Sequence, residues 1–348
     1  MQPRWILARP IAPADNRICW PDLCGSECIA RLLQRKQFQC TDDVRAFLNP
    51  RLAGLADPFL LGGMQQAVER IFHAIDCRQR IALFGDYDVD GVTSLALLSE
   101  ILRAYGNDPA LFLPLRMEEG YGLSAEGAAR CLRQHQPQLL IAIDCGTSSV
   151  AEIRSIKKAG VDVIVVDHHE PKAELPDCLL VNPKTIDSAF HYLCSVGLIF
   201  KLCHALLKTR RIDFDLKSAL DLVALGTVAD IVPLRGDNRV FVKSGSTVIG
   251  RSGRIGITKL MEVAGVAQPV MPEDIGFRLG PRLNAAGRLA TAEKALRLLV
   301  TDSQIEAAQL AHELDVQNRH RQEVEKHILQ EAEEELSRSF DASRDAGI

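Results

Sequence analysis

Three carboxylates stand at alternate positions in the segment DYDVDG, where Asp86, Asp88 and Asp90 precede Gly91. The segment directly follows RIALFG at Arg80–Gly85, a short apolar run of the length typical of a β-strand. Acids that follow a parallel strand lie at the edge where open α/β sheets bind their ligands. The spacing therefore predicts a binding site at the end of this strand.

Two further apolar runs, and one apolar helical segment, also end in residues that can bind a metal. Their end residues are Asp144 after LLIAI, Asp167, His168 and His169 after the run 161–166, and Asp230 after GTVA. A single acid at a strand end is common as a helix cap. Several neighbouring elements that all end in Asp or His favour a shared site.

Five acids in one cleft would raise one another's pKa and destabilise the fold unless cations neutralised them. Oxygen ligands with one imidazole favour Mn²⁺ or Mg²⁺ over a zinc site built from Cys and His. Two such ions about 3.5–4 Å apart stabilise both the attacking and the leaving oxygen of a phosphoryl displacement. The residues therefore predict a two-metal centre.

The elements that must position these residues alternate between helix and strand. We predict strands at 80–85, 109–114, 139–143 and 161–166, and helices at 65–76, 92–105, 124–135, 148–159, 196–207 and 216–228. This alternation predicts an α/β fold with a doubly wound, mostly parallel sheet. A smaller helical region and one long, charged connecting helix at Ile305–Leu336 should follow it.

The 348 residues are enough for about two domains at roughly 150 residues each. We divide them into a lead-in region at 1–64 that packs on the next domain, a sheet domain at 65–235, a helical and loop region at 236–304, and a connecting helix with its tail at 305–348. With 47% hydrophobic and 25% charged residues, a disordered or fibrous protein is excluded.

No apolar run approaches the ~18 residues of a membrane span, and no signal peptide is visible. Ten scattered cysteines in a chain of this length favour reduced thiols, so we expect a cytoplasmic protein without a membrane anchor. The net charge of −4 alone predicts no polyanionic partner. The segment Arg235–Lys259, however, holds six bases and one acid.

Taken in order, the segments DYDVDG, DCG at Asp144, DHH at Asp167 and GTVAD resemble the four motifs of the DHH phosphoesterase superfamily. LRMEEGYGLS at Leu115–Ser124 and GPRLNAAGR at Gly280–Arg288 narrow the resemblance to the RecJ family of single-strand-specific 5′ to 3′ exonucleases. The resemblance covers about Gln65–Val300 and makes 65–235 a DHH domain.

The resemblance implies a ligand set for two ions, Mn²⁺ or Mg²⁺. Asp86 and Asp88 would hold one ion, Asp144 would bridge both as a catalytic residue, and Asp90, His168 and Asp230 would hold the other. Successive side chains of an extended segment point to opposite faces, so His168 and His169 should not both ligate one ion. His169 is then the catalytic residue that contacts the scissile phosphate or acts as an acid, while Asp167 orients a neighbour.

Substrate-binding residues are implied in the same way. Arg116 resembles the family's phosphate-binding arginine, and Ser195 stands at a helix start where phosphate could bind. Arg282, Asn284 and Arg288 occupy what we predict to be a loop before a helix that opens near Thr291.

The implied function is a metal-dependent hydrolase that removes mononucleotides from the 5′ end of single-stranded DNA, in repair and recombination. We expect a monomer whose partners include single-stranded DNA and, beyond it, a single-strand-binding protein or a helicase. Two alternatives stay open: a DHH phosphoesterase for pyrophosphate, short oligonucleotides or cyclic dinucleotides, and a non-catalytic DNA-binding homologue. Because the family continues into a DHHA1 domain and an oligonucleotide-binding fold, we expect a fragment or a shortened homologue, truncated before or within DHHA1.

Overall fold

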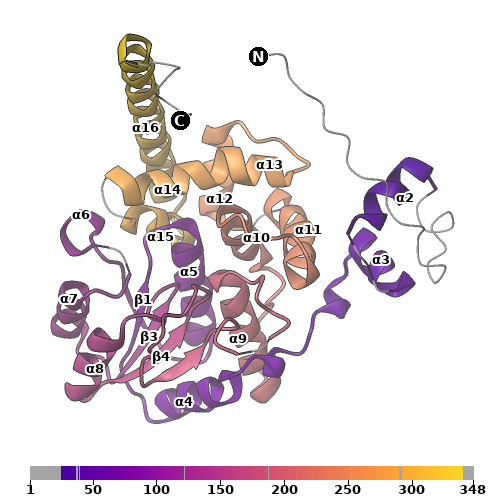
Figure 1. Cartoon of the computed structure of the whole chain (residues 1–348). Helices are drawn as coiled ribbons and strands as arrows, with labels where there is room; N and C mark the ends of the chain where they lie inside the picture. The colour runs from indigo at the N-terminus through magenta and orange to yellow at the C-terminus, as the bar shows by residue number, and fades with distance from the viewer. Residues whose placement is uncertain are drawn as a thin grey trace.

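The computed structural model describes residues 25–339 apart from 37, 39, 121, 187, 252, 290 and 291. Its centre is a sheet of five parallel strands in the order β2-β1-β3-β4-β5 (Figure 1). The strands are β1 (Ile81–Gly85), β2 (Ala110–Phe112), β3 (Leu139–Ile143), β4 (Asp162–Val166) and β5 (Leu179–Val181). The prediction of a doubly wound parallel sheet is confirmed, and β5 was not predicted.

The strands bury both faces, so they consist of nearly continuous apolar residues. Alternate side chains of β1 and β3 enter two separate cores. One face packs against α4 (Met64–Asp76), α5 (Val89–Ala104) and α9 (Ser195–Thr209). The opposite face packs against α7 (Ala125–His135) and α8 (Val150–Lys158).

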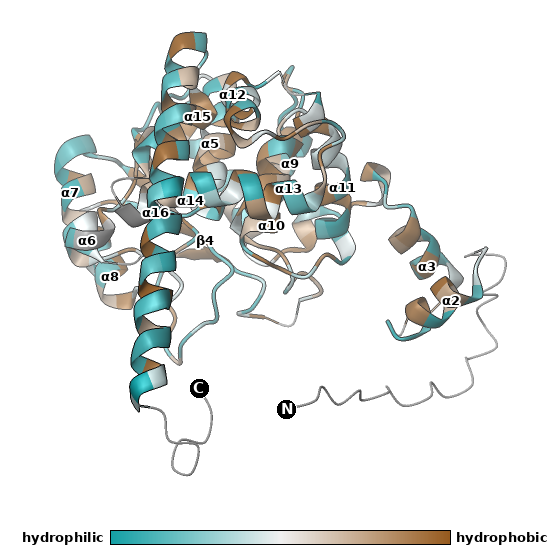
Figure 2. Ribbon diagram, turned by 90° about the horizontal axis from the view of Figure 1, so that it is seen from above, coloured by the Kyte–Doolittle hydropathy of each residue, from teal (hydrophilic) through white to brown (hydrophobic). Residues whose placement is uncertain are grey.

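Helices from the second half of the chain extend the larger core. After α10 (Leu220–Ala229) they are α11 (Gly236–Gly250), α12 (Ile255–Ala264), α13 (Pro272–Asp274), the π-helical segment η3 (Ile275–Leu279), α14 (Gly280–Leu289) and α15 (Glu293–Val300). The long helix predicted at Ile305–Leu336 is α16 (Gln304–Ser339), whose first half packs on α12 and α14 and whose second half is exposed. Figure 2 shows it projecting past the body of the molecule.

The N-terminal part holds α2 (Glu27–Gln34), α3 (Thr41–Leu48) and the 3-10 turns η1 (Leu52–Gly54) and η2 (Pro58–Leu60). The first two helices share a small apolar cluster of their own, formed by Ala30, Leu33 and Val44. Figure 1 shows α2 and α3 to one side of the body, and the end of α3 contacts α11 where Arg239 donates to the Phe47 carbonyl at 2.6 Å. Among the described residues, no helix has both the length and the apolar character needed to cross a membrane.

Two local predictions are wrong. The helix predicted from Val92 starts at Val89, because the Asp88 side chain accepts a 3.0 Å hydrogen bond from Gly91 N–H and caps it. The predicted loop around GPRLNAAGR is helix α14. Pro281 lacks an N–H, and the π turn just before it shifts the hydrogen-bond register so that the helix can continue through the proline.

Candidate metal centre

Strand register brings the first acids of the site together. Gly85 of β1 pairs with Ile143 of β3, and Ile143 pairs with Val166 of β4. The next residues along the three strands are Asp86, Asp144 and Asp167. They follow neighbouring strands at the β1/β3 junction, where the strand order of a doubly wound sheet reverses and ligands bind.

The start of α5 adds two more acids. Asp88 caps the helix, and Asp90 lies in its first turn, fully buried. Gly91 has to be a glycine, because a Cβ there would stand 2.3 Å from the backbone oxygen of Asp86. This close backbone approach keeps the acids of DYDVDG together.

The N-terminus of α9 holds two of these acids in place. Ser195 and Val196 donate their N–H groups to Asp90 Oδ2 and Oδ1 at 2.7 and 2.8 Å. The Ser195 hydroxyl donates to Asp144 Oδ1 at 2.8 Å. Ser195 is completely buried, so its side chain contacts the acids of the site and not solvent.

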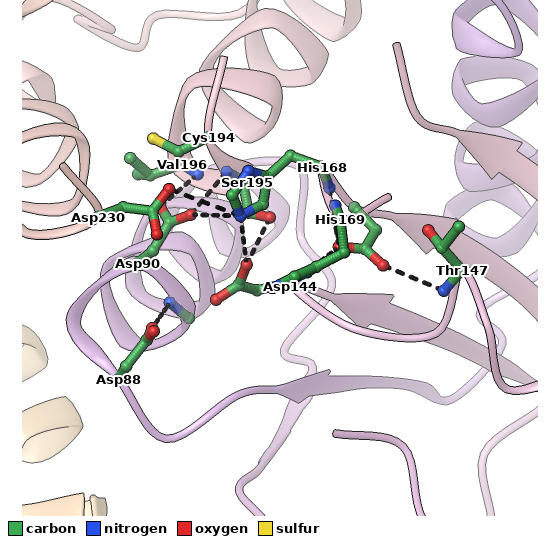
Figure 3. A network of polar contacts seen from close by, with 12 residues as sticks. Asp88, Asp90, Asp144, Thr147, His168, His169, Cys194, Ser195, Val196 and Asp230 are labelled. Carbon is green, nitrogen blue, oxygen red and sulfur yellow. Dashed lines mark hydrogen bonds and ion pairs between the residues drawn. The ribbon is translucent and has the colours of Figure 1, made fainter. Parts of the chain in front are cut away.

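His168 lies at the centre of the acids (Figure 3). Its Nε2 is 3.4 Å from Asp144, 3.6 Å from Asp230 and 3.9 Å from Asp90, measured to carboxylate oxygens. Although it is buried, this atom has no hydrogen-bond partner in the described part of the chain. A buried imidazole nitrogen that faces several carboxylates without a hydrogen bond has the surroundings of a metal ligand.

His169 lies beside His168, with 4.6 Å between the ring centroids. Ligand atoms of Asp144, His168 and His169 all lie within 4.8 Å of one another, so the expectation that the two imidazoles diverge is wrong. The backbone leaves the extended conformation after β4, because Asp167 Oδ1 accepts the N–H groups of both histidines, at 2.7 and 3.2 Å. Because of this turn, the two successive side chains do not point to opposite faces as they would in a strand.

Asp167 also orients His169. Its Oδ1 lies 2.8 Å from His169 Nδ1, and its Oδ2 accepts Thr147 N–H at 3.0 Å. Burial works against the charge of Asp167, but the hydrogen bonds from His169 and Thr147 hold its pKa below the usual range. The same bond raises the pKa of His169, whereas burial and the neighbouring His169 lower that of His168 to about 4.

The acids strongly disfavour one another's charge. Burial, followed by Asp230 and Asp88, raises the pKa of Asp90 well above its ordinary value. Burial and then Asp90 do the same to Asp144, and burial and then Asp88 raise the pKa of Asp230 to about 6. These are the shifts expected where several acids are buried together, and divalent cations bound among them would favour the charged forms.

The donor geometry fits divalent cations. Asp86, Asp88 and Asp144 form one group of carboxylates with oxygens within 4.8 Å, and Asp144 faces His168 in another. Asp90 and Asp230 form a further group with the thiol of Cys194, which the sequence motifs did not reveal. Carboxylates dominate these groups, so the residues suit Mn²⁺ or Mg²⁺.

The residues predicted to bind substrate have different surroundings. Arg282 lies on α14, where its Nε donates to Asp315 Oδ1 at 2.9 Å, and Asn284 Oδ1 accepts Val89 N–H at 3.0 Å. Both side chains therefore join α14 to its neighbours. Arg116 belongs to the short helix α6 (Arg116–Glu119) and Arg288 to α14, but their side chains lie outside the described residues.

Comparison with known proteins agrees with this geometry. Residues 80–227 match the family described as "DHH family, N-terminal domain". The single-stranded-DNA-specific exonuclease RecJ of Bacillus subtilis is 38% identical over 333 residues, covering 94% of this chain and 42% of that protein. The Escherichia coli RecJ is 42% identical over 301 residues, covering 81% of this chain and 52% of that protein. The chain thus spans about half the length of these curated relatives.

Solved structures give the same result. A crystal structure of exonuclease RecJ bound to manganese matches with a TM-score of 0.73 and 39% identity, over 78% of this chain and 69% of that one. A structure of the Thermus thermophilus RecJ in complex with Mn²⁺ matches with a TM-score of 0.74 and 36% identity, over 85% of this chain and 42% of that one. With the DHH motif in place and the same fold around it, the chain belongs to the RecJ family.

Proposed function

We propose that this chain is a two-metal phosphodiesterase that hydrolyses single-stranded DNA from its 5′ end. The observation that carries the proposal is Asp144, whose oxygens take part in two donor groups at once, beside the Nε2 of His168, which has no hydrogen-bond partner among the described residues. A carboxylate shared between a group of carboxylates and a group with two imidazoles is an arrangement that suits two ions.

Each ion has its own residues. One ion would be held by Asp86 and Asp88. The other ion would be held by Asp90, His168 and Asp230, and Asp144 would ligate both ions. Bound there, the ions would lower the pKa of a water and offset charge on the phosphate. Ser195 keeps Asp144 and Asp90 oriented for this role.

His169 is the proposed proton donor. Asp167 engages its Nδ1 and orients the ring, so Nε2 is the nitrogen that would face a substrate. The raised pKa keeps the imidazole charged nearer neutral pH, so it can contact the scissile phosphate and protonate the leaving oxygen. The side chain is 42% exposed, which gives a substrate access to it.

The substrate class is supported by the relatives, which are named as single-stranded-DNA-specific exonucleases. On the family resemblance, we extend the proposal to five further properties. These are the 5′ polarity, the mononucleotide product, a role in DNA repair and recombination, a cytoplasmic location and a monomeric state. We also propose, on the same resemblance, that a single-strand-binding protein or a helicase is a partner.

The proposal is tested with 5′-labelled single-stranded DNA, the same sequence as duplex, and pyrophosphate, each with Mn²⁺ or with EDTA. Mn²⁺-dependent release of labelled mononucleotide from the single strand alone is expected. Asp144→Asn should abolish it, and Asp213→Asn, an exposed acid elsewhere on the chain, should not. Faster hydrolysis of pyrophosphate, cleavage in EDTA or no turnover of any substrate would contradict the proposal.

A further inference from the structure

The basic segment Arg235–Lys259 divides into two parts in the structure. Its later members are paired with acids: the largely buried Arg254 donates to Asp221 at 3.0 Å, and Lys259 donates to Glu262 on the surface of α12 at 2.8 Å. Glu100 also pairs with Arg254, at 2.5 Å. These ion pairs neutralise Arg254 and Lys259 within the protein, so the two cations have little remaining capacity to bind an external anion.

The earlier members, Arg235 and Arg239, have different surroundings. Arg235 lies over the ring of Tyr192 with 5.4 Å to its centroid, and Arg239 lies over Phe47 at 3.7 Å. Arg239 also donates to the carbonyl of Phe47 at 2.6 Å. Within the described part of the chain, neither guanidinium has a carboxylate within 4 Å. Both cations therefore keep capacity for an anion while resting on aromatic faces.

Arg235 and Arg239 line a cavity of about 900 Å³ between α3, the turn η1 and the start of α11, which we call the arginine cavity. Arg51 lines it as well, again without an ion pair to any described residue. The two acids of the lining are engaged: Asp237 pairs with the buried Lys201, and Asp43 accepts Cys40 N–H at 3.2 Å. The cavity therefore has an excess of positive charge.

The arginine cavity is close to the metal centre along the chain. Helices α10 and α11 pack against each other, and Asp230 ends α10 whereas Arg235 directly precedes α11. The two positions are five steps apart along the chain, so their Cα atoms lie at most about 18 Å apart. A short stretch of polymer could therefore touch both.

We propose that the arginine cavity is a second anion subsite, which binds the phosphodiester backbone of the strand whose end occupies the metal centre. The inference rests on the proposed function and adds a residue set to it. A polymeric phosphate fits because guanidinium groups that lack a described carboxylate partner gather on one surface, as in the basic grooves that follow a single-stranded backbone. An acidic protein segment is the competing occupant.

The test compares Arg235→Glu with Arg251→Glu. Arg251 belongs to the same basic segment, is exposed and follows the opposite end of α11, about 22 Å away along the helix. Binding of a fluorescein-labelled oligothymidylate 12-mer is measured in EDTA at several salt concentrations. We expect about tenfold weaker binding and a shallower salt dependence for Arg235→Glu, and parent-like binding for Arg251→Glu.

A second variant and a catalytic measurement distinguish a lost binding contact from a folding defect. Arg51→Glu, on the opposite wall, should weaken binding in the same way with an unchanged melting temperature. With Mn²⁺, Arg235→Glu should raise KM for the 12-mer more than KM for a dinucleotide, since the 12-mer reaches further from the metal centre, and Arg251→Glu should raise neither.

Each result has a distinct meaning. Equal affinities of the parent, Arg235→Glu and Arg251→Glu, or equal losses in both variants, would overturn the subsite and leave the proposed function intact. Displacement of the 12-mer by polyglutamate of matched charge would overturn nucleic acid as the occupant in favour of an acidic protein. A parent that binds no oligonucleotide at all would overturn the substrate class itself.

Discussion

Ser195 donates a 2.8 Å hydrogen bond from its hydroxyl to Asp144 Oδ1, and its N–H donates to Asp90 Oδ2 at 2.7 Å. One residue at the start of α9 thus fixes two candidate ligands that come from different elements. Asp144 has a φ of 62°, in the left-handed region that aspartate adopts more readily than most residues other than glycine. The bond holds its carboxylate in one orientation.

We therefore predict that Ser195→Ala weakens Mn²⁺ binding by roughly 10–100-fold, the usual effect of removing a group that orients a ligand. Isothermal titration calorimetry measures the change directly, and Ser195→Thr should restore part of it. Ser94→Ala is the matched control, because Ser94 is buried on α5 and its hydroxyl has no partner among the described residues. Equal Mn²⁺ affinities in both alanine variants would contradict the orienting role.

Asp144→Asn should remove the increase in melting temperature that Mn²⁺ gives the parent. The residue belongs to two donor groups, so its loss impairs both ions, and ligand-induced stabilisation falls with the loss of binding. Thermal unfolding with Mn²⁺ and with EDTA measures this effect. Asp213→Asn should keep the full shift, and a full shift in Asp144→Asn would show that the bridging assignment is wrong.

Much of the fold could be predicted from the sequence because its signals are local. The runs RIALFG and LLIAI are long, apolar and followed by acids, so they identify β1, β3 and the sheet edge. The three-residue strand β5 has too few residues to show a period. In α14, the local turn signals of Gly280 and Pro281 are overridden by the π turn that precedes them.

The site shows the same division. The acids of DYDVDG and the histidines stand in recognisable motifs, whereas Cys194 and Ser195 reach the cluster only through the placement of α9 on the sheet. The turn that brings His169 next to His168 depends on the two backbone hydrogen bonds that the Asp167 carboxylate accepts. A prediction that assumes an extended strand does not include such a turn. The motifs therefore left out one contact between distant segments, at α9, and one local turn, at Asp167.

The contribution of Asp230 to the stability of the metal-free protein should fall as the pH rises, whereas His168, whose pKa is lowered to about 4, acts in the opposite direction. The pKa of Asp230 is raised to about 6, chiefly by burial, so the folded state binds this proton more tightly than the unfolded chain does. The resulting stability is present below the ordinary carboxyl pKa of 3.8 and is lost as pH rises through about 6. Asp90 and Asp144, whose pKa values are also raised, act in the same direction.

Chemical unfolding in EDTA, at pH values of about 5 and about 7.5, tests this dependence. Asp230→Asn, which keeps a neutral side chain, should stabilise the metal-free protein more at the higher pH than at the lower one. Added Mn²⁺ should stabilise the parent most at the higher pH, because the ion replaces the missing protons. A stabilising effect of the variant that does not change with pH would contradict this coupling.

The last prediction concerns the segment that carries Arg116. Arg130 on α7 donates from Nε and a terminal nitrogen to the two oxygens of Glu119, at 2.6 and 2.9 Å, and also to the carbonyl of Leu113 at 2.9 Å. Glu119 in turn accepts Leu115 N–H at 2.8 Å. This bidentate pair joins both ends of the segment to α7, so it holds the predicted phosphate-binding residue in place.

Arg130→Lys should loosen the segment, since a lysine cannot form the bidentate pair. We expect faster amide exchange at residues 113–119 and a higher KM for single-stranded DNA at nearly constant kcat. The effects of Arg130→Lys and Glu119→Gln should be non-additive by roughly 0.5–3 kcal/mol, because both changes remove the same contact. Arg133→Lys, an exposed position on the same helix, should leave exchange and KM unchanged. Additive effects, or a loss confined to kcat, would show that the pair supports only the fold and does not position the segment for substrate.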